Sequence, residues 1–262
     1  MTLHSKIGIF DSGIGGITVT KEIMRSLPHY DIIYLADTAR FPYGEKPTPS
    51  IIQYATEAVR FLLEEGAQSI VIACNTVCST ALNTLKQLFS IPIFDIIEPV
   101  AQQALFLSNT KKVGLLATPQ TIQSGLYSTY IDNLIAVPTP LLAQMVEHGC
   151  SNSQEIQRLV HNYLQPIIGN VDTLILGCTH YSILSPYIQQ ELGKNVHIVD
   201  PAHILAQEVV ATLSHFPSHS SSSWFSTQNP LKFKQLAEPI LGQNIPSVQL
   251  ATYARRREIH YV

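Results

Sequence analysis

Short apolar runs alternate with helix-type patterns along the first part of the chain. The runs are typical of buried strands, and they cover Lys6–Phe10, Ile32–Leu35, Ser69–Ala73 and Ile91–Ile96. Between them, apolar residues recur at helical spacing and predict three helices. The first covers Ile17–Ser26, the second runs from an N-cap at Ser50 to an end near Gly66, and the third begins at Asn75. This β-α-β-α-β order predicts parallel strands that are joined by helical crossovers.

The same alternation returns from Val113. We expect strands at Val113, near Ala136, at Thr173–Leu176 and at Val196–Val199, and helices at Thr121–Leu134, Ser153–Ile168 and from Ile183. The predicted fold class is α/β, with two pseudo-symmetric parallel-sheet domains and the active site in the cleft between them. Boundaries near Pro99 and His203 give a first domain of residues 1–98 plus 208–262 and a second domain of residues 99–207. The serine-rich stretch Ser214–Ser223 is interpreted as a flexible surface loop.

Two pairs of segments repeat in order at nearly the same spacing. I-V-I-A-C-N-T at Ile70–Thr76 resembles L-I-L-G-C-T-H at Leu174–His180, and K-I-G-I-F-D-S near the start resembles K-V-G-L-L-A-T from Lys112. In each unit a cysteine, Cys74 or Cys178, closes a strand and opens a helix. Open α/β sheets bind ligands at that edge, and a helix N-terminus stabilises a thiolate. Two opposed thiols can remove a proton from one side of a carbon and return one from the other.

A single buried cysteine is more often inert packing than catalytic, so position and repetition carry the argument for this pair. Cys78, one helical turn after Cys74, is interpreted as packing, and Cys150 has no motif and no assigned role. His180 follows Cys178 by two residues and is a candidate for tuning that thiol or relaying its proton. Glu147 ends an apolar, helix-like stretch and by itself is interpreted as a solvated surface charge.

The turn D-S-G-I-G-G at Asp11–Gly16 lacks the G-x-G-x-x-G spacing of a dinucleotide site. We interpret it as a glycine-rich turn that lets a small anionic ligand approach the backbone, with Asp11 and Ser12 at its rim, or as a purely structural turn. No metal-ligand spacing and no lysine suited to pyridoxal phosphate are visible, so we expect neither metal nor cofactor. The proline- and glycine-rich segment Arg40–Pro49 is predicted to be a loop, and we hypothesise that it gates the site.

Composition narrows the class of partner. The 262 residues are 45% apolar and 13% charged, with a net charge of −3, which indicates a compact folded protein and gives no attraction for nucleic acid or membrane surfaces. The basic cluster Arg255–Arg257 is interpreted as a solvated tail. The start lacks signal-peptide character, no apolar stretch is long enough to span a bilayer, and the four cysteines show no C-x-x-C spacing. We therefore expect a cytoplasmic protein with a small-molecule substrate.

Motifs along essentially the whole chain resemble those of the glutamate racemases, in the aspartate/glutamate racemase superfamily. They are F-D-S-G-I-G-G, A-D-T-A-R-F-P-Y-G-E-K-P, A-C-N-T, T-P-Q-T-I-Q-S-G-L-Y, M-V-E-H-G, L-G-C-T-H-Y and F-S-T-Q-N-P-L-K-F-K-Q-L-A. The resemblance implies a cofactor-independent enzyme that supplies D-glutamate for peptidoglycan, an inserted second domain and a homodimer. It also implies that the chain lacks the N-terminal extension of members that need a peptidoglycan precursor as activator.

The resemblance assigns residues by their matching positions. Cys74 and Cys178 would be the catalytic pair, Asp11 and His180 their supporting partners, and Glu147 and Asp37 would lie close by. The positions that match substrate-holding residues are Ser12, Tyr43, Gly44, Asn75, Thr76, Thr118, Thr121 and Thr179.

The chain departs from the family pattern at Val77, Cys78, Ala36 and Ala117, positions that touch the shape of the pocket. Three alternatives therefore stay open: an aspartate racemase of the same superfamily, a catalytically idle homologue with a binding or regulatory role, and a cysteine hydrolase. The hydrolase would use Cys178 as nucleophile and His180 as base. It leaves Cys74 unexplained, and residues two apart at a helix start need not point at each other.

Overall fold

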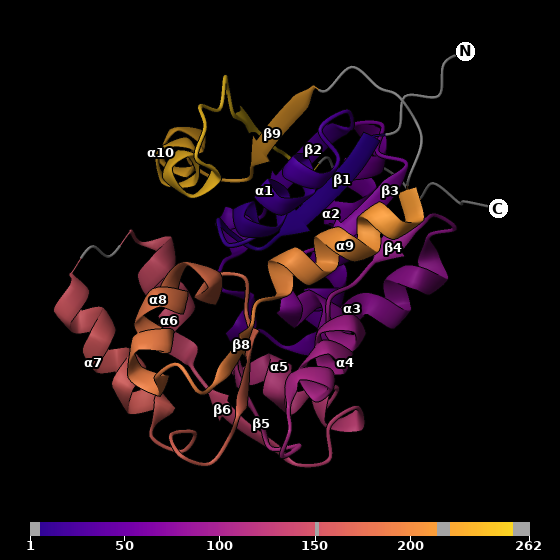
Figure 1. Ribbon diagram of the computed structural model, residues 1–262. Coiled ribbons are helices and arrows are strands. Elements are labelled where there is room, and N and C mark those ends of the chain that lie inside the picture. The colour runs from indigo at the N-terminus through magenta and orange to yellow at the C-terminus, as the bar shows by residue number, and fades with distance from the viewer. Residues whose placement is uncertain (1–5, 150–151, 214–220, 254–262) are drawn as a thin grey trace.

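The computed structural model describes residues 6–149, 152–213 and 221–253 (Figure 1). Cys150, the basic cluster Arg255–Arg257 and residues 214–220 of the serine-rich stretch lie outside the described residues. Figure 1 shows two α/β units, with β1, β2, β3 and β9 in the upper one and β5, β6 and β8 in the lower one, and α9 lying near the place where they meet.

The first sheet has six strands in the order β10-β9-β2-β1-β3-β4, and every pairing is parallel. Its strands are β1 (Lys6–Asp11), β2 (Asp31–Ala36), β3 (Ser69–Ile72), β4 (Ile93–Phe94), β9 (Ser222–Ser226) and β10 (Gln249–Leu250). Strands β2 and β3 are buried along their whole length. Helices cover both faces of such a sheet, so its central strands are continuously apolar rather than alternating.

The second sheet has four strands in the order β6-β5-β7-β8, again all parallel. They are β5 (Val113–Ala117), β6 (Leu134–Pro138), β7 (Thr173–Gly177) and β8 (His197–Val199). Two parallel sheets with intervening helices confirm the predicted fold class.

Helices connect successive strands of each sheet. They are α1 (Ile17–Ser26), α2 (Thr48–Glu64), α3 (Asn75–Leu88), α4 (Ile97–Leu107), α5 (Pro119–Gln123), α6 (Pro140–Glu147), α7 (Ser153–Leu164), α8 (Tyr181–Leu192), α9 (Pro201–Leu213) and α10 (Pro230–Leu241). The crossovers from β1 to β2 and from β2 to β3 run in opposite directions along the first sheet, so right-handed connections put α1 and α2 on opposite faces. On these faces α1 packs with α9 and α10, and α2 packs with α3. No helix in the described ranges combines the length and apolar character that a membrane span requires.

Several predicted elements were wrong in extent. The predicted helix Thr121–Leu134 is only the short α5, because Gly125 adopts a left-handed backbone with φ of 69° and Leu134 already belongs to β6. The strand predicted at Ile91–Ile96 shortens to Ile93–Phe94. The helix predicted over Ser153–Ile168 ends at Leu164.

Two predicted loops also end earlier than expected. Helix α2 begins at Thr48 rather than after Ser50, since Pro49 fits the first turn of a helix, where the missing N–H has no partner to lose. The segment before it contains two short 3₁₀ turns, Thr38–Arg40 and Tyr43–Glu45. Ser222 and Ser223, predicted to lie in a flexible loop, form the start of β9 and pair with β2.

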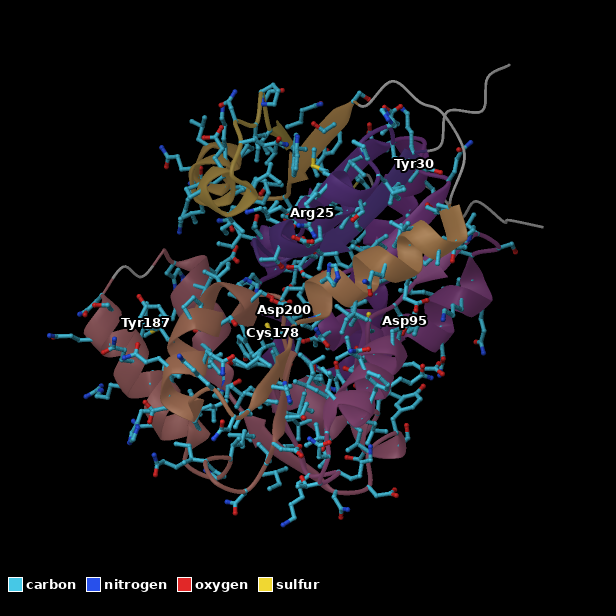
Figure 2. All side chains as sticks on the ribbon, viewed as in Figure 1. Arg25, Tyr30, Asp95, Cys178, Tyr187 and Asp200 are labelled. Carbon is cyan, nitrogen blue, oxygen red and sulfur yellow. The ribbon has the colours of Figure 1, made fainter. Side chains whose placement is uncertain are left out.

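The carboxyl ends of the central strands of both sheets face one another. Asp11 ends β1, Cys74 follows β3, Thr118 follows β5 and Cys178 follows β7. Residues at this edge of a parallel sheet are those that contact ligands. The chain therefore brings the polar ends of two sheets to one place, and Figure 2 shows Cys178 there, near the middle of the molecule.

Candidate active site

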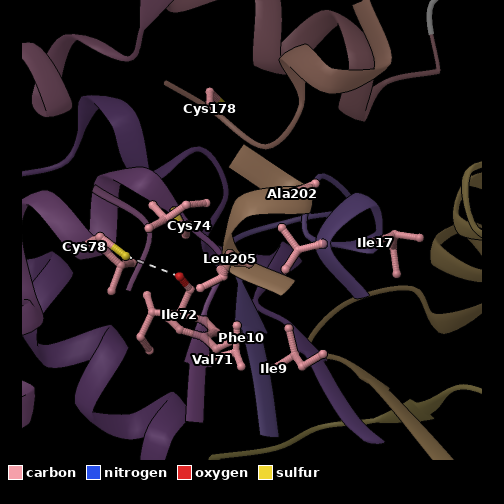
Figure 3. Close-up of a cluster of buried hydrophobic side chains, with 14 of the residues drawn as sticks. Ile9, Phe10, Ile17, Val71, Ile72, Cys74, Cys78, Cys178, Ala202 and Leu205 are labelled. Atoms are coloured by element: carbon pink, nitrogen blue, oxygen red, sulfur yellow. Dashed lines mark hydrogen bonds between the residues drawn. The ribbon is translucent and has the colours of Figure 1, made fainter. Parts of the chain in front are cut away.

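Two cysteines from different sheets line one narrow cavity. Cys74 is the N-cap of α3 and Cys178 follows β7, and both thiols are free. Their exposed fractions are 5% and 7%, so bulk water has little access to either. Figure 3 shows them on separate segments, with Cys78 turned away and donating to the carbonyl of Ile72. In this conformation the cavity has a volume of about 20 Å³, room for about one water molecule.

Cys178 is the first member of a chain of three polar side chains. Its sulfur lies 3.6 Å from Nδ1 of His180, and Nε2 of His180 lies 2.7 Å from Oε2 of Glu147. His180 is the N-cap of α8 and Glu147 ends α6, so two helix termini fix this geometry. The ring of Phe41 lies against the imidazole. Cys178 and His180 are only two residues apart at the start of a helix, and their side chains do meet. Glu147 is buried and pairs with His180, so its interpretation as a solvated surface charge was wrong.

Cys74 has different neighbours. Its thiol donates to Oγ of Ser12 at 3.6 Å. Asp11 is fully buried close by, and it accepts hydrogen bonds from the backbone of Gly13 and from the hydroxyl of Thr179. The bond from Thr179 to Asp11 joins the end of β1 in the first sheet to the residue that follows Cys178 after β7 in the second.

The two thiols differ in their electrostatic surroundings. Burial, together with the nearby Asp11 carboxylate, raises the pKa of Cys74 to about 12. Burial lowers the pKa of His180, but the hydrogen bonds to Cys178 and Glu147 outweigh it and hold the pKa well above its usual value. A protonated imidazole beside Cys178 favours a negatively charged sulfur. The site therefore pairs a protonated thiol at Cys74 with a protonated imidazole beside Cys178.

Burial also raises the pKa of the Asp11 carboxyl to about 6, although His180 and the backbone N–H of Gly13 act against it. The folded protein therefore holds this proton more tightly than the unfolded chain does. As a result, the free energy of unfolding decreases as the pH rises from about 4 to about 6, and the contribution is constant above that.

Replacing Asp11 with asparagine should remove this dependence. We expect the free energy of unfolding of Asp11→Asn, relative to the parent, to rise by up to about 3 kcal/mol between pH 4 and pH 6. Urea denaturation at a series of pH values measures the difference. A constant offset between the two proteins across this range would contradict the raised pKa of Asp11.

The glycine-rich turn is the place where the second sheet's residues approach the first. Oε2 of Glu147 accepts a hydrogen bond of 2.9 Å from the backbone N–H of Ile14, and a Cβ on Gly13 would overlap this carboxylate. A Cβ on Gly15 would overlap Thr179 and His180. The turn was interpreted either as a site for a small anionic ligand or as purely structural; in the structure the side-chain carboxyl of Glu147 lies against its backbone at Ile14.

Gly13→Ala should therefore disturb the site rather than the fold. The new methyl group must push the Glu147 carboxylate off Ile14 and His180, and we expect kcat/KM to fall about a hundredfold at a stability cost of about 1–3 kcal/mol. Steady-state kinetics and thermal unfolding measure the two effects. In a Glu147→Ala background the overlap is absent, and the same substitution should add almost nothing; an equal loss there would contradict this explanation.

Hydroxyl and amide groups line the rest of the cavity. Thr76 at the start of α3 and Thr118 before α5 share a hydrogen bond of 2.9 Å, and Thr118 also bonds Thr121. Asn75, the first residue of α3, accepts a hydrogen bond from Tyr127. Within the described part of the chain, no lysine or arginine lines this cavity. Any carboxylate held here would be bound by hydroxyls and N–H groups instead of by a lysine or an arginine.

The 3₁₀ segment after β2 forms another wall. The hydroxyl of Tyr43 donates to Asp37 at 2.5 Å, and Thr227 donates to the other carboxylate oxygen. Arg40 lies between the rings of Tyr54 and Tyr253, with its guanidinium 4.3 Å and 4.4 Å from their centroids. It also pairs with Asp37 at 3.5 Å. Asp37 thus holds Tyr43 in place and does not itself line the cavity.

The structure brings most of the sequence-selected residues to the cavity surface. Those that line it are Ser12, Tyr43, Gly44, Cys74, Asn75, Thr76, Thr118, Cys178, Thr179 and His180. Asp11, Asp37, Thr121 and Glu147 stand behind them and bond to lining residues. Sequence reasoning missed Pro140 and Ala143 of α6 and the aromatic Phe41 and Tyr127. Only their positions inside the matching motifs could have indicated the last two.

In the ranges that the structure covers, no group of three or more histidine, cysteine, aspartate or glutamate side chains is arranged to hold a metal ion. The polar groups at the site are instead joined to one another, from Glu147 through His180 to Cys178 and from Thr179 to Asp11.

Two parallel α/β sheets that present one thiol each to a shared, water-poor cavity define a class of protein suited to moving protons at carbon. This chain belongs to the Asp/Glu/Hydantoin racemase family, whose model matches residues 7–209. A glutamate racemase from Streptococcus suis is 38% identical over 255 residues, covering 91% of this chain and 96% of that protein.

Solved structures agree with this membership. A glutamate racemase isoform from Bacillus anthracis superposes with a TM-score of 0.89 at 34% identity, over 95% of this chain and 98% of that one. A glutamate racemase from Francisella tularensis in complex with D-glutamate gives a TM-score of 0.84 at 30% identity, over 95% and 98%.

Proposed function

We propose that this protein interconverts L- and D-glutamate without a cofactor, by removal and return of the proton on Cα. One cysteine as thiolate takes the proton, and the other as thiol supplies a proton to the opposite face. The observation that carries the proposal is that Cys74 and Cys178 come from different sheets and line one cavity. His180 and Glu147 support Cys178, and Asp11 and Ser12 support Cys74.

The Cα–H of an amino acid is a very weak acid, so the two thiols cannot lower the barrier alone. Most of the effect must come from fixed dipoles and exclusion of water around the developing carbanion. Three features of the cavity suit this: its low exposure, the start of α3 at Asn75, and the hydroxyls of Thr76 and Thr118. The substrate carboxylates would bind to Ser12, Tyr43, Gly44, Asn75, Thr76, Thr118 and Thr179, with Thr121 holding Thr118 and Asp37 holding Tyr43.

Glutamate is favoured over aspartate because the relatives at 35–38% identity over 91% of this chain are glutamate racemases. The experiment is proton NMR of L-glutamate and L-aspartate, each incubated with the pure protein in D₂O. We expect loss of the glutamate Cα–H signal together with formation of the D-enantiomer. Faster exchange with aspartate would change the substrate, and no exchange with either would favour an idle homologue.

One observation favours a second candidate, the cysteine hydrolase. Cys178, His180 and Glu147 form a thiol–imidazole–carboxylate chain with hydrogen-bond contacts at each step. A hydrolase needs no second thiol, so its activity would survive Cys74→Ala. Hydrolysis of a glutamate γ-ester that persists in this variant would support the second candidate.

The two sheets support our proposal that residues 1–98 plus 208–262 and residues 99–207 are separate domains. β9 and β10 belong to the first sheet although they follow the second sheet in the sequence. We further propose a cytoplasmic homodimer that supplies D-glutamate for peptidoglycan. Size-exclusion chromatography with light scattering tests the dimer.

The narrow cavity supports the proposal that the Arg40–Pro49 segment gates the site. About 20 Å³ is far too little for an amino acid, and Phe41, Pro42, Tyr43 and Gly44 form one wall. Substrate entry would therefore require part of the lining to move, and we propose that it is this wall. Shortening the tip of the segment with no change in kinetics would contradict the gate.

A further inference from the structure

In the side-chain amide of Asn75, the oxygen has a hydrogen-bond partner and the nitrogen has none among the described residues. Its Oδ1 accepts a hydrogen bond of 2.8 Å from the hydroxyl of Tyr127. Its Nδ2 is buried and has no hydrogen-bond partner among the described residues. Asn75 is 2% exposed and lines the cavity between the two cysteines. A buried amide nitrogen without an acceptor is costly, because it has lost water and gained nothing in exchange.

Tyr127 determines whether the oxygen or the nitrogen of the Asn75 carboxamide is left without a hydrogen-bond partner. The phenol has a single proton, and the only hydrogen bond of this hydroxyl in the described structure is the one that it donates to Asn75. If the carboxamide turned over, its Nδ2 would donate to the phenol oxygen, and the buried O–H of Tyr127 would then lack an acceptor. Tyr127 is only 2% exposed, so water could not replace that acceptor. The hydroxyl therefore fixes Oδ1 toward Tyr127 and leaves the two N–H donors of Nδ2 without an acceptor among the described residues.

We propose that Tyr127 is a positioning residue that fixes the Asn75 carboxamide with its N–H groups toward the cavity, where they receive a carboxylate of the substrate. The inference rests on the proposed function and names a residue outside the set that the sequence selected. Tyr127 belongs to the 3₁₀ turn Tyr127–Thr129 between the second sheet's β5 and β6, whereas Asn75 starts α3 of the first. The orientation of the Asn75 carboxamide, beside the first sheet, therefore depends on the position of Tyr127, beside the second.

The reversed carboxamide would present Oδ1, an acceptor, to a carboxylate, and two negatively polarised oxygens repel each other. Tyr127→Phe removes the hydroxyl and frees Asn75 to populate both orientations. Only the orientation with Nδ2 toward the cavity binds a carboxylate. In the variant, that orientation also leaves Oδ1 without the hydroxyl of Tyr127 from which it accepts a hydrogen bond in the parent. We expect KM for glutamate to rise about tenfold while kcat changes less than about threefold.

A double-mutant cycle separates positioning from simple loss of packing. In an Asn75→Ala background, Tyr127→Phe should raise KM no further, because Tyr127 acts only through the carboxamide. Tyr130→Phe is the matched control: it lies in the same segment, is 36% exposed, and should leave both constants unchanged. Thermal unfolding of each variant shows whether the protein is folded under assay conditions.

The outcomes are distinct. An unchanged KM in Tyr127→Phe, or an equal increase in the Asn75→Ala background, overturns the inference while the proposed function stands. A parent protein that exchanges the Cα proton of neither glutamate nor aspartate overturns the proposed function and this inference with it. The positioning role is supported if Tyr127→Phe changes KM much more than kcat and if this increase in KM is absent in the Asn75→Ala background.

Discussion

Replacing either Cys74 or Cys178 with alanine is expected to lower racemisation in both directions by about a thousandfold or more. Each substitution removes one of the two groups that must take or supply the Cα proton, and a positioned acid or base contributes about 10²–10⁴-fold. The remaining thiol can still reach one face of the substrate. The measurement is circular dichroism of each glutamate enantiomer over time, with proton NMR in D₂O to follow Cα–H exchange separately.

Cys78→Ala provides the matched control for these variants. Cys78 is buried one helical turn after Cys74, its thiol donates to the backbone of Ile72, and it does not line the cavity. We expect its activity to stay within about threefold of the parent, although the lost packing lowers stability. Full racemase activity in Cys74→Ala or Cys178→Ala would overturn the two-thiol mechanism.

Glu147→Gln is expected to reduce kcat/KM about a hundredfold and to change its dependence on pH. The neutral amide removes the charge that helps to keep His180 protonated, so the pKa of His180 falls. The imidazole then loses its proton as the pH rises, and the positive charge beside Cys178 is lost. The activity of the variant should therefore decline with increasing pH over a range in which the parent stays constant. The profile of kcat/KM against pH, in both directions, measures this.

The surface pair of His161 and Glu191 offers a control for charge removal. Glu191→Gln also deprives a histidine of its carboxylate partner, but this pair is exposed and remote from the cavity. We expect no change in the pH profile, because exposed ion pairs contribute little. A Glu147→Gln profile parallel to that of the parent would show that Glu147 does not hold the His180 proton.

Elements with clear periodicity could be predicted closely from the sequence. Helix α1 begins and ends at the residues that its amphipathic pattern predicts, Ile17 and Ser26, and the central strands β1 and β3 differ by a residue from their predicted ends. Errors arose where one local feature overrode a pattern. Gly125 ends a helix that the apolar spacing would have continued. Because Trp224 and Phe225 are buried, the serines just before them belong to strand β9 and not to a loop.

The site shows a different limit. Cys74 and Cys178 could be selected because each sits at a strand end with a repeated motif. The meeting of His180 with Glu147 depends on how α6 and α8 pack, and no local pattern encodes that distance. For the same reason Glu147, judged alone, suggested a surface charge. The unpartnered amide of Asn75 and the hydroxyl of Tyr127 that orients it emerge only from three-dimensional contacts.

The order of strands in the first sheet has a consequence for the growing chain. β2 pairs with β9, whose residues Ser222–Ser226 are synthesised after all four strands of the second sheet. A ribosome therefore completes the second sheet while the outer edge of β2 still lacks its neighbour. Unpaired strand edges recruit other chains, and nascent proteins fold from the N-terminus. Between the synthesis of Ala36 and that of Ser226, the edge of β2 is therefore open to pairing with a strand of another chain.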